Sequence, residues 1–264
     1  MVKIIKPSVE ILTPLNNDDL LKHIEKCGRT CYQSYENTTD DSTSAKKMIN
    51  MLIKSGHESV LEHFSISVKM KVDVGVYKDI TRHRAGTAFS IESTRFCNYS
   101  KGKFGNELTF IAPCNLISNE ELYNKWLDTV KCIENNYIEM SKLGAKPDQL
   151  RMILPHSTAA EVCMTANLRS WRHIFKMRCA KAAHPSVREI MLMLLYEFHS
   201  KIDVVFDDLF EEFYDTYLSE GNTVHDIKDP VGDMIYRYIK VQNESDEINI
   251  DSYVLQETEC VKNV

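Results

Sequence analysis

Residues 64–72 read Phe-Ser-Ile-Ser-Val-Lys-Met-Lys-Val, so every second side chain is large and apolar. Successive side chains of a strand point to opposite faces, and this alternation therefore predicts a strand with one buried face. Two further strands are expected, one near the start of the chain and one in its middle. They cover residues 2–12 and 108–111.

Apolar side chains elsewhere recur at the three-to-four-residue spacing of amphipathic helices. The first helix has a strong start signal, because Asn16 is a good helix cap and acids follow it. Helices are expected over residues 16–27, 42–54 and 120–143, from Pro185 to Phe198, and directly after Phe206. The apolar faces of the second and third helices are expected to hold Ala45, Met48, Met51 and Leu52, and Leu122, Trp126, Val130 and Ile133. Helices dominate over a few strands, which predicts an α+β fold.

Length and composition are those of one large globular domain. The chain has 264 residues, of which 43% are hydrophobic, and a formal charge of −6. No run approaches the roughly 20 apolar residues of a membrane-spanning helix, and the first residues lack the apolar stretch of a secretion signal. We therefore expect a cytoplasmic protein without a membrane partner. The eight cysteines are scattered, without a two-residue gap between any pair, so no structural metal is expected.

The end of the chain has a different composition from the rest. Beyond Tyr238 the residues are mostly polar and acidic. Such a segment has little apolar surface to bury, and we expect it to be loosely held. The chain is accordingly divided into one domain over residues 1–240 and an acidic extension over residues 241–264.

Two runs are strongly basic although the protein is acidic. Residues 82–95 read Arg-His-Arg-Ala-Gly-Thr-Ala-Phe-Ser-Ile-Glu-Ser-Thr-Arg, and residues 82–103 hold five Lys or Arg against one acid, a net of +4. Residues 169–188 hold six Lys or Arg and no acid, a net of +6. Guanidinium groups pair bidentately with phosphate oxygens, and hydroxyls satisfy the remaining lone pairs. The two runs therefore indicate converging walls of one phosphate-binding site.

Arg82, His83 and Arg84 are consecutive, which limits what they contact together. On a helix over residues 73–84 they would point about 100° apart. They are then expected to bind different parts of one large ligand with several phosphates. Flanking positive charge opposes protonation of an imidazole, so His83 is expected to be neutral and to act as a hydrogen-bond partner.

Several short blocks, taken in order, resemble one known family. Gly-His-Glu-Ser-Val-Leu-Glu-His (56–63), Arg-His-Arg (82–84) and Glu-Ser-Thr-Arg-Phe (92–96) are followed by Arg-Met-Ile-Leu-Pro (151–155), Thr-Ala-Asn-Leu-Arg-Ser (165–170), Phe-Lys-Met-Arg (175–178) and Ala-His-Pro (183–185). Over about residues 8–200 the chain resembles the flavin-dependent thymidylate synthases. The resemblance implies a single large catalytic domain with helices packed on a small, mostly antiparallel sheet.

The resemblance also implies an activity, the methylation of dUMP to dTMP. Carbon would come from methylenetetrahydrofolate and electrons from NADPH through bound FAD, so the protein binds and orients the reactants and supplies electrostatic stabilisation. The family implies a homotetramer in which each site combines residues of several subunits. Arg82 would then reach a nucleotide that is held mainly by a neighbouring subunit.

Matching positions in the family assign roles to individual residues. Those implied to bind FAD are Ser59, Arg82, His83, Arg84, Asn167, Arg169 and His173, with His57 and His184 lining the pocket. Those implied to bind dUMP are Asp79, Arg82, Glu92, Ser93, Thr94, Arg95, Arg151 and Arg178. Among them, Arg178 matches the catalytic arginine that contacts the pyrimidine and favours its ionised form by stabilising negative charge.

The sequence departs from the family pattern near the first basic run. Eight residues instead of seven separate Arg-His-Arg from Ser93, Ile91 stands where Gln or Glu is frequent, and Phe96 replaces a frequent Tyr. An isoleucine forms no hydrogen bond with flavin or uracil, and Glu92 is the residue in the longer loop able to compensate. One-carbon transfer to another pyrimidine nucleotide, or transfer of hydroxymethyl instead of methyl, therefore stays open.

A non-catalytic role also stays open. Tyr99, Lys101, Lys103 and Phe104 interleave aromatic rings with cations, a pattern found in nucleotide- and RNA-binding proteins. Against it, an isoelectric point near 5.9 disfavours nonspecific affinity for nucleic acid. We therefore expect no nucleic-acid partner.

Overall fold

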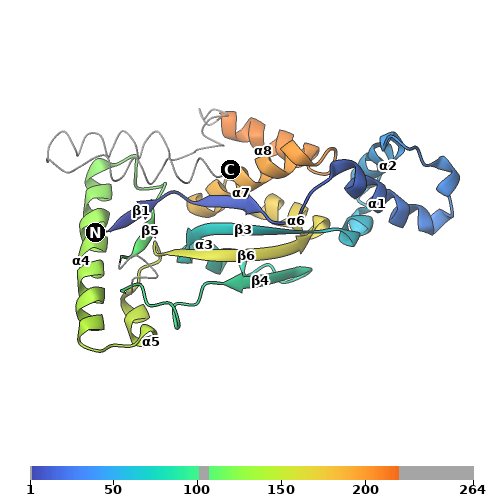
Figure 1. Ribbon diagram of the computed structural model, residues 1–264. Coiled ribbons are helices and arrows are strands. Elements are labelled where there is room, and N and C mark those ends of the chain that lie inside the picture. The colour runs from blue at the N-terminus through green and yellow to red at the C-terminus, as the bar shows by residue number, and fades with distance from the viewer. Residues whose placement is uncertain (1, 101–106, 220–264) are drawn as a thin grey trace.

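The computed structural model describes residues 2–100 and 107–219, and its centre is a four-stranded antiparallel sheet in the order β2-β3-β6-β4. A parallel pair, β1 and β5, lies beside it (Figure 1). The strands are β1 Lys3–Ile5, β2 Ser8–Ile11, β3 Ser65–Asp73, β4 Thr87–Ile91, β5 Thr109–Ile111 and β6 Ala159–Asn167. The α+β prediction is confirmed. The acidic extension 241–264 lies outside the described residues, as do Lys101, Lys103 and Phe104.

The strand predicted from alternation is β3, and its apolar side chains at 66, 68, 70 and 72 are fully buried. The single strand expected over residues 2–12 is wrong, because the chain forms two strands there. Pro7 lies between them, and proline has no N–H to donate to a ladder. Consequently β1 pairs with β5, whereas β2 pairs with β3.

Two strands were not predicted from the sequence. The first is β6, which pairs with β3 over nine residues and is therefore central to the sheet. Its alternating buried positions include Ala160 and Ala166, whose small side chains weaken the hydrophobic pattern. The second is β4, which occupies most of the segment expected to be a loop between Arg84 and Ser93. It pairs with β6 at the edge of the sheet.

The expected helices are present, and further helical segments accompany them. The helices are α1 Asn17–Arg29, α2 Thr43–Lys54, α3 Val74–Ile80, α4 Glu120–Lys142, α5 Pro147–Leu150, α6 Leu168–Arg178, α7 Pro185–Lys201 and α8 Asp207–Ser219. The short 3-10 turns are η1 Thr30–Tyr32, η2 Tyr35–Asn37, η3 Glu58–His63 and η5 Arg151–Ile153. Asn16 caps α1 as predicted, since its side chain accepts hydrogen bonds from the N–H groups of Asp18 and Asp19. No helix of the described residues has the length and apolar content needed to cross a membrane.

The predicted buried faces of α2 and α4 are partly wrong. Met51 is 56% exposed and Leu122 is 51% exposed. On α4 the buried stripe begins instead at Tyr123 and includes Glu134, whose carboxylate accepts a hydrogen bond from the N–H of Leu108 at 3.0 Å. The buried face of α4 was predicted wrongly because apolar spacing does not identify a buried glutamate, whose carboxylate is hydrogen-bonded to a residue far away in the sequence.

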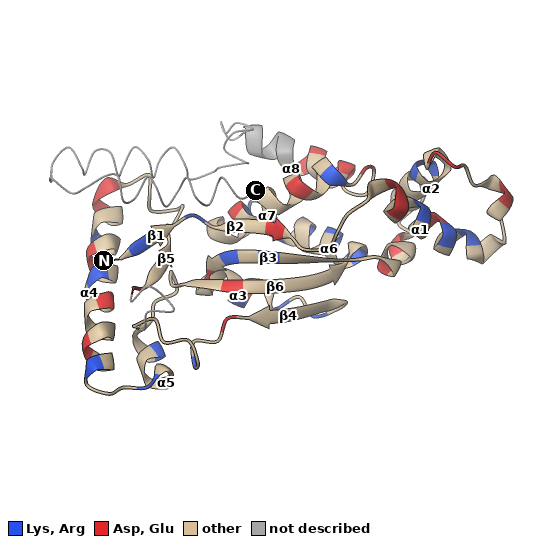
Figure 2. Cartoon of the chain, in the orientation of Figure 1, with Lys and Arg blue, Asp and Glu red and all other residues tan. Residues whose placement is uncertain are grey.

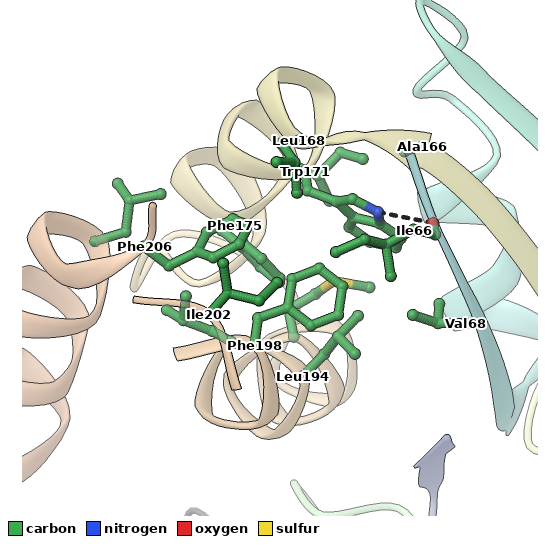
Figure 3. Packing of buried hydrophobic residues seen from close by; sticks show 14 of the residues in the cluster. Ile66, Val68, Ala166, Leu168, Trp171, Phe175, Leu194, Phe198, Ile202 and Phe206 are labelled. Atoms are coloured by element: carbon green, nitrogen blue, oxygen red, sulfur yellow. Dashed lines mark hydrogen bonds between the residues drawn. The ribbon is translucent and has the colours of Figure 1, made fainter. Parts of the chain in front are cut away.

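An aromatic cluster fixes α6 against the sheet. Figure 3 shows Trp171 and Phe175 of α6 packed with Phe198 of α7 and Phe206, and their ring centroids lie 5.3–5.8 Å apart. The Trp171 indole also donates a hydrogen bond to the carbonyl of Ile66 in β3 at 3.1 Å. Full burial of one such ring contributes about 2 kcal/mol or more to stability. The position of α6 is therefore set by the core.

A second, smaller core lies where α4 and α5 meet β1 and β5. Its buried residues include Tyr99, Phe110, Tyr137 and Leu150. Figure 1 shows α4 beyond one end of the sheet and α1 with α2 beyond the other. The segment after β4, which carries Tyr99, is thus held by the second core, whereas α6 is held by the first.

Candidate functional site

Two strand-to-helix junctions aim α3 and α6 at each other. Strand β3 runs directly into α3 through Asp73, whose carboxylate accepts a hydrogen bond from the Val76 N–H at 2.7 Å. Strand β6 runs into α6 through Asn167, whose side chain accepts from the Ser170 N–H at 2.8 Å. Because β3 and β6 are antiparallel, the two helices begin at opposite ends of a strand pair about 30 Å long. With lengths of about 10 and 16 Å, they bring their C-terminal ends together above the sheet.

Arg178 joins these two C-terminal ends. Its Nη2 donates to the backbone carbonyl of Asp79 at 3.0 Å, and its Nε donates to Nε2 of His83 at 2.9 Å. The Asp79 carbonyl also accepts from the Arg82 N–H at 3.4 Å, and a cation from α6 is favoured at this negative end of the α3 dipole. The His83 ring also meets the ring of His173 edge-on, with centroids 5.9 Å apart. Four of the predicted site residues therefore meet at one place.

The backbone after His83 lies against the start of α6. The Ser170 hydroxyl donates to the Ala85 carbonyl at 2.9 Å, and the Asn167 N–H donates to the Gly86 carbonyl at 3.3 Å. Gly86 has φ +67°, and a Cβ there would lie 2.7 Å from both the Asn167 side-chain nitrogen and the Ser170 hydroxyl. Only glycine fits this approach. The docking roles of Gly86 and Ser170 were missed from the sequence, although a glycine between two elements is a turn signal.

Helix α3 ends at Ile80, so Arg82, His83 and Arg84 lie beyond it and not on a helix over residues 73–84. The chain then turns, and the His83 N–H donates to the Ile80 carbonyl at 3.1 Å. His83 is half-buried between an exposed Arg82 and an exposed Arg84. Two cations therefore face solvent on either side of an imidazole that faces the protein.

The environment of His83 keeps it neutral. Burial, followed by the charges of Arg178, His173 and Arg82, lowers the pKa of His83 to about 4. A neutral Nε2 is also what the hydrogen bond requires, since Arg178 has only donors. The prediction that His83 is a neutral hydrogen-bond partner is confirmed, with burial adding to the effect of charge.

Turn η3 carries two more of the predicted cofactor residues. His57 and Ser59 are exposed at its start. The turn is tied to α6 by an ion pair between Glu62 and Arg169, with an N–O distance of 2.5 Å. His184 is exposed and is the N-cap residue of α7. His57 and Ser59 therefore lie on a turn bound to α6, the helix that carries Arg169.

The second basic run is not a continuous cationic wall, which corrects the sequence interpretation. Arg172 is 1% exposed and binds Asp208 of α8 bidentately, with both N–O distances 2.7 Å. It also donates to Glu58 of η3 at 3.2 Å. Figure 2 shows the acidic segments of α8 that complement this side of α6. Along α6, Arg172 faces inward to tie α8 and η3 together, whereas His173 is exposed and Arg178 is half-buried.

Most of the residues implied to bind dUMP lie at or beyond the far end of β4, whereas Asp79, Arg82 and Arg178 belong to the group around His83. Ser93 opens a turn in which its carbonyl accepts from the N–H groups of Phe96 and Cys97 at 3.1 and 3.0 Å. Arg95 is exposed, with its guanidinium 5.5 Å from the centre of the Phe96 ring. Five residues of strand, about 17 Å, separate this turn from Gly86.

The remaining members of the set are near this turn in the chain or in the second core. Thr94 is half-buried within the turn, and Arg151 is exposed at the start of η5, whose Ile153 packs on the same small core as Cys97. The carboxylate of Glu92 is bound by groups of the chain itself. One protomer therefore holds two separate groups of predicted site residues, one at each end of β4.

Comparison with known proteins agrees with the motifs. The family model described as thymidylate synthase complementing protein matches residues 15–202. A flavin-dependent thymidylate synthase of Corynebacterium diphtheriae is 26% identical over 215 residues, which cover 75% of this chain and 81% of that protein. Proteins of the same name from Pyrococcus abyssi and Mycolicibacterium gilvum are 29% and 26% identical, covering 62% and 83% of this chain and 66% and 88% of theirs. The family match spans well over half of the sequence. The chain therefore belongs to the thymidylate synthase complementing protein family.

Proposed function

We propose that the protein is a flavin-dependent thymidylate synthase that methylates dUMP to dTMP, with methylenetetrahydrofolate as the carbon donor and NADPH as the source of electrons. One observation carries the proposal. The blocks that resemble the family, separated by about ninety residues of sequence, meet in the fold where Arg178 binds His83 and Asp79. Relatives that share these blocks carry the name of this activity.

The donor set around His83 suits the anionic part of FAD. Arg82, Arg84 and His173 are exposed there, and no acid lies between residues 80 and 91. Planar guanidinium groups match the oxygen geometry of a pyrophosphate. His57 and Ser59 on η3, with Asn167 and Arg169 on α6, would extend the same surface, and His184 would line it. Bound FAD would supply the hydride that reduces the transferred carbon.

Arg178 is the proposed catalytic residue because the fold fixes its charge and leaves donors available. Among the described residues, two of its five N–H groups have partners, one at His83 and one at Asp79. The other three can bind a pyrimidine oxygen. A fixed cation stabilises negative charge that develops on the ring, without the cost of reorganisation during the reaction. His83 contributes by accepting a hydrogen bond as a neutral group, which holds the guanidinium without competing for the anion.

The turn after β4 would hold the phosphate of dUMP. Ser93, Thr94 and Arg95 offer two hydroxyls and a cation, and Arg151 offers a second cation. Strand β4, about 17 Å long, lies between Arg82 and this turn in the chain. This separation supports an active site shared between copies, as in a homotetramer, with Arg82 reaching a nucleotide held mainly by another subunit.

The test reconstitutes purified protein with FAD and compares Arg178→Ala with Lys176→Ala. Lys176 is exposed on the same helix, and in the part of the chain that the structure describes its ion pair is a long 3.6 Å contact with Glu58, so it serves as the matched control. We expect both variants and the wild type to retain flavin after desalting. Only Arg178→Ala should fail to form dTMP. Undiminished turnover by Arg178→Ala would overturn the assigned role, and a wild type that loses flavin on desalting would overturn the proposed function.

A further inference from the structure

Glu92 ends strand β4 in an unusual way. Its backbone N–H donates to the Glu161 carbonyl at 2.9 Å, which continues the ladder with β6. In an antiparallel pair the return bond would run from the Glu161 N–H to the backbone carbonyl of Glu92. Here that N–H donates to the carboxylate of Glu92 instead, at 3.0 Å. The side chain thus replaces the backbone acceptor at the residue where the chain leaves the sheet.

The second carboxylate oxygen closes the loop that follows. The Tyr99 hydroxyl donates to it at 2.8 Å, so the first and last residues of segment 92–99 are joined. Between them lies the turn in which the Ser93 carbonyl accepts from two N–H groups. Ser93, Thr94 and Arg95 therefore lie on a loop whose two ends are joined at the Glu92 carboxylate.

Lys71, on β3 and thus two strands away from β4, places a positive charge beside the Glu92 carboxylate. Its ammonium lies 3.5 Å from the Glu92 carboxylate and 3.7 Å from that of Glu161. The Lys71 and Glu92 side chains are only 28% and 15% exposed, so solvent screens this contact less than an ordinary surface pair.

Polar contacts add to the packing of the second core in holding the loop at this point. Lys71, Glu92, Tyr99 and Thr158 all line a cavity of about 70 Å³. A side chain beside a cavity loses the van der Waals contacts that would otherwise fix it. The hydrogen bonds and charges at the Glu92 carboxylate then restrain the direction in which the loop leaves β4.

We infer that Glu92, Tyr99 and Lys71 are positioning residues for the nucleotide phosphate. They set the orientation of Ser93 and Arg95 through the Glu92 carboxylate and do not themselves contact dUMP. The inference rests on the proposed function, because it takes the turn after β4 to be the phosphate site. It also gives Glu92 a different role from the direct contact that the sequence resemblance implies.

Tyr99→Phe tests the inference, with Tyr137→Phe as the matched control. Tyr137 is a buried tyrosine of the same small core, and its ring centroid lies 6.2 Å from that of Tyr99. Its hydroxyl accepts a hydrogen bond from the Tyr99 backbone N–H, whereas the Tyr99 hydroxyl donates to Glu92. Each variant removes one hydroxyl and keeps the ring. For Tyr99→Phe we expect KM for dUMP to rise about tenfold with kcat within twofold of wild type, as for loss of a charge-assisted hydrogen bond. Tyr137→Phe should leave both constants near the wild-type values.

A double variant shows whether the effect passes through the carboxylate. If Tyr99 acts through Glu92, the rise in KM for Tyr99→Phe with Glu92→Gln should be smaller than the product of the two single effects. Lys71→Met should raise KM in the same direction. Equal KM values for Tyr99→Phe and Tyr137→Phe, or multiplicative effects in the double variant, would overturn the inference while leaving the proposed function intact. A wild-type protein that neither binds dUMP nor forms dTMP would overturn both.

Discussion

Replacing Arg172 with methionine should destabilise the fold strongly. Its guanidinium is 1% exposed and holds three segments together, since it binds Asp208 of α8, Glu58 of η3 and the carbonyl of Val205. Breaking a buried pair by removing one partner costs about 3–5 kcal/mol. Asp208 is 48% exposed and can be rehydrated, so we place the loss near the lower end, at about 3 kcal/mol. For a protein of this size that corresponds to a fall in Tm of roughly 6–12 °C.

The assay is urea and thermal unfolding of Arg172→Met beside Arg169→Met. Arg169 lies one turn earlier on α6, and its pair with Glu62 is about half exposed on both sides. An exposed pair contributes about 1 kcal/mol at most, so the control should unfold close to the wild type. Equal stability of the two variants would refute the structural role of Arg172. The second basic run would then again be open to interpretation as a wall of the ligand site.

Two further predictions concern the segment that lies beside α6. Gly86→Ala should destabilise the protein by about 1–3 kcal/mol and weaken flavin retention. The reason is that φ is positive at Gly86 and an added Cβ would collide with the side chains of Asn167 and Ser170. Unchanged unfolding and unchanged flavin retention would contradict this prediction. The pKa of His83 is lowered to about 4 from an unfolded value near 6.5, so the unfolded chain binds the extra proton between these values. The His83 contribution to stability should therefore be complete above pH 6.5 and be lost as the pH falls towards 4, by about 2 kcal/mol after allowance for solvent screening. NMR titration, with the His83 signal assigned by comparison with His83→Gln, measures the pKa of His83 in the folded protein. A folded-state pKa near 6.5 would contradict the prediction.

The parts of the fold that follow a clean periodicity were predictable from the sequence. Strand β3 alternates large apolar and polar residues, and α1 begins at a cap that its own side-chain chemistry identifies. Strand β6 has the same alternation, but alanines occupy three of its buried positions and reduce the signal. Strand β6 is stabilised by pairing with β3, which is far away in the sequence and therefore not predicted by a local pattern.

Within the site, the sequence does not show which arginine is structural and which is available for a ligand. Arg172 and Arg178 belong to one basic run and to one helix, yet the first is buried in ion pairs while the second joins α3 to α6. Net charge along the chain counts them equally. The acids that neutralise Arg172 come from residues 58 and 208, so only the folded chain distinguishes the two arginines.

The neutral state of His83 was predictable in direction because its neighbours in sequence are cations. Its main cause was not predictable, since burial follows from the turn after Ile80 and from contact with α6. The role of Glu92 was likewise hidden, because a carboxylate that replaces a strand carbonyl depends on where β4 ends.

The most direct test of the proposed activity identifies the product. Purified protein with FAD, NADPH and methylenetetrahydrofolate would be given dUMP and dCMP in separate reactions and in competition, and the nucleotides resolved by chromatography with mass spectrometry. We predict that dUMP is converted to dTMP and that dCMP is left unchanged, with no product when Arg178 is replaced by alanine. A hydroxymethylated nucleotide, faster conversion of dCMP, or no conversion of either substrate would contradict the account.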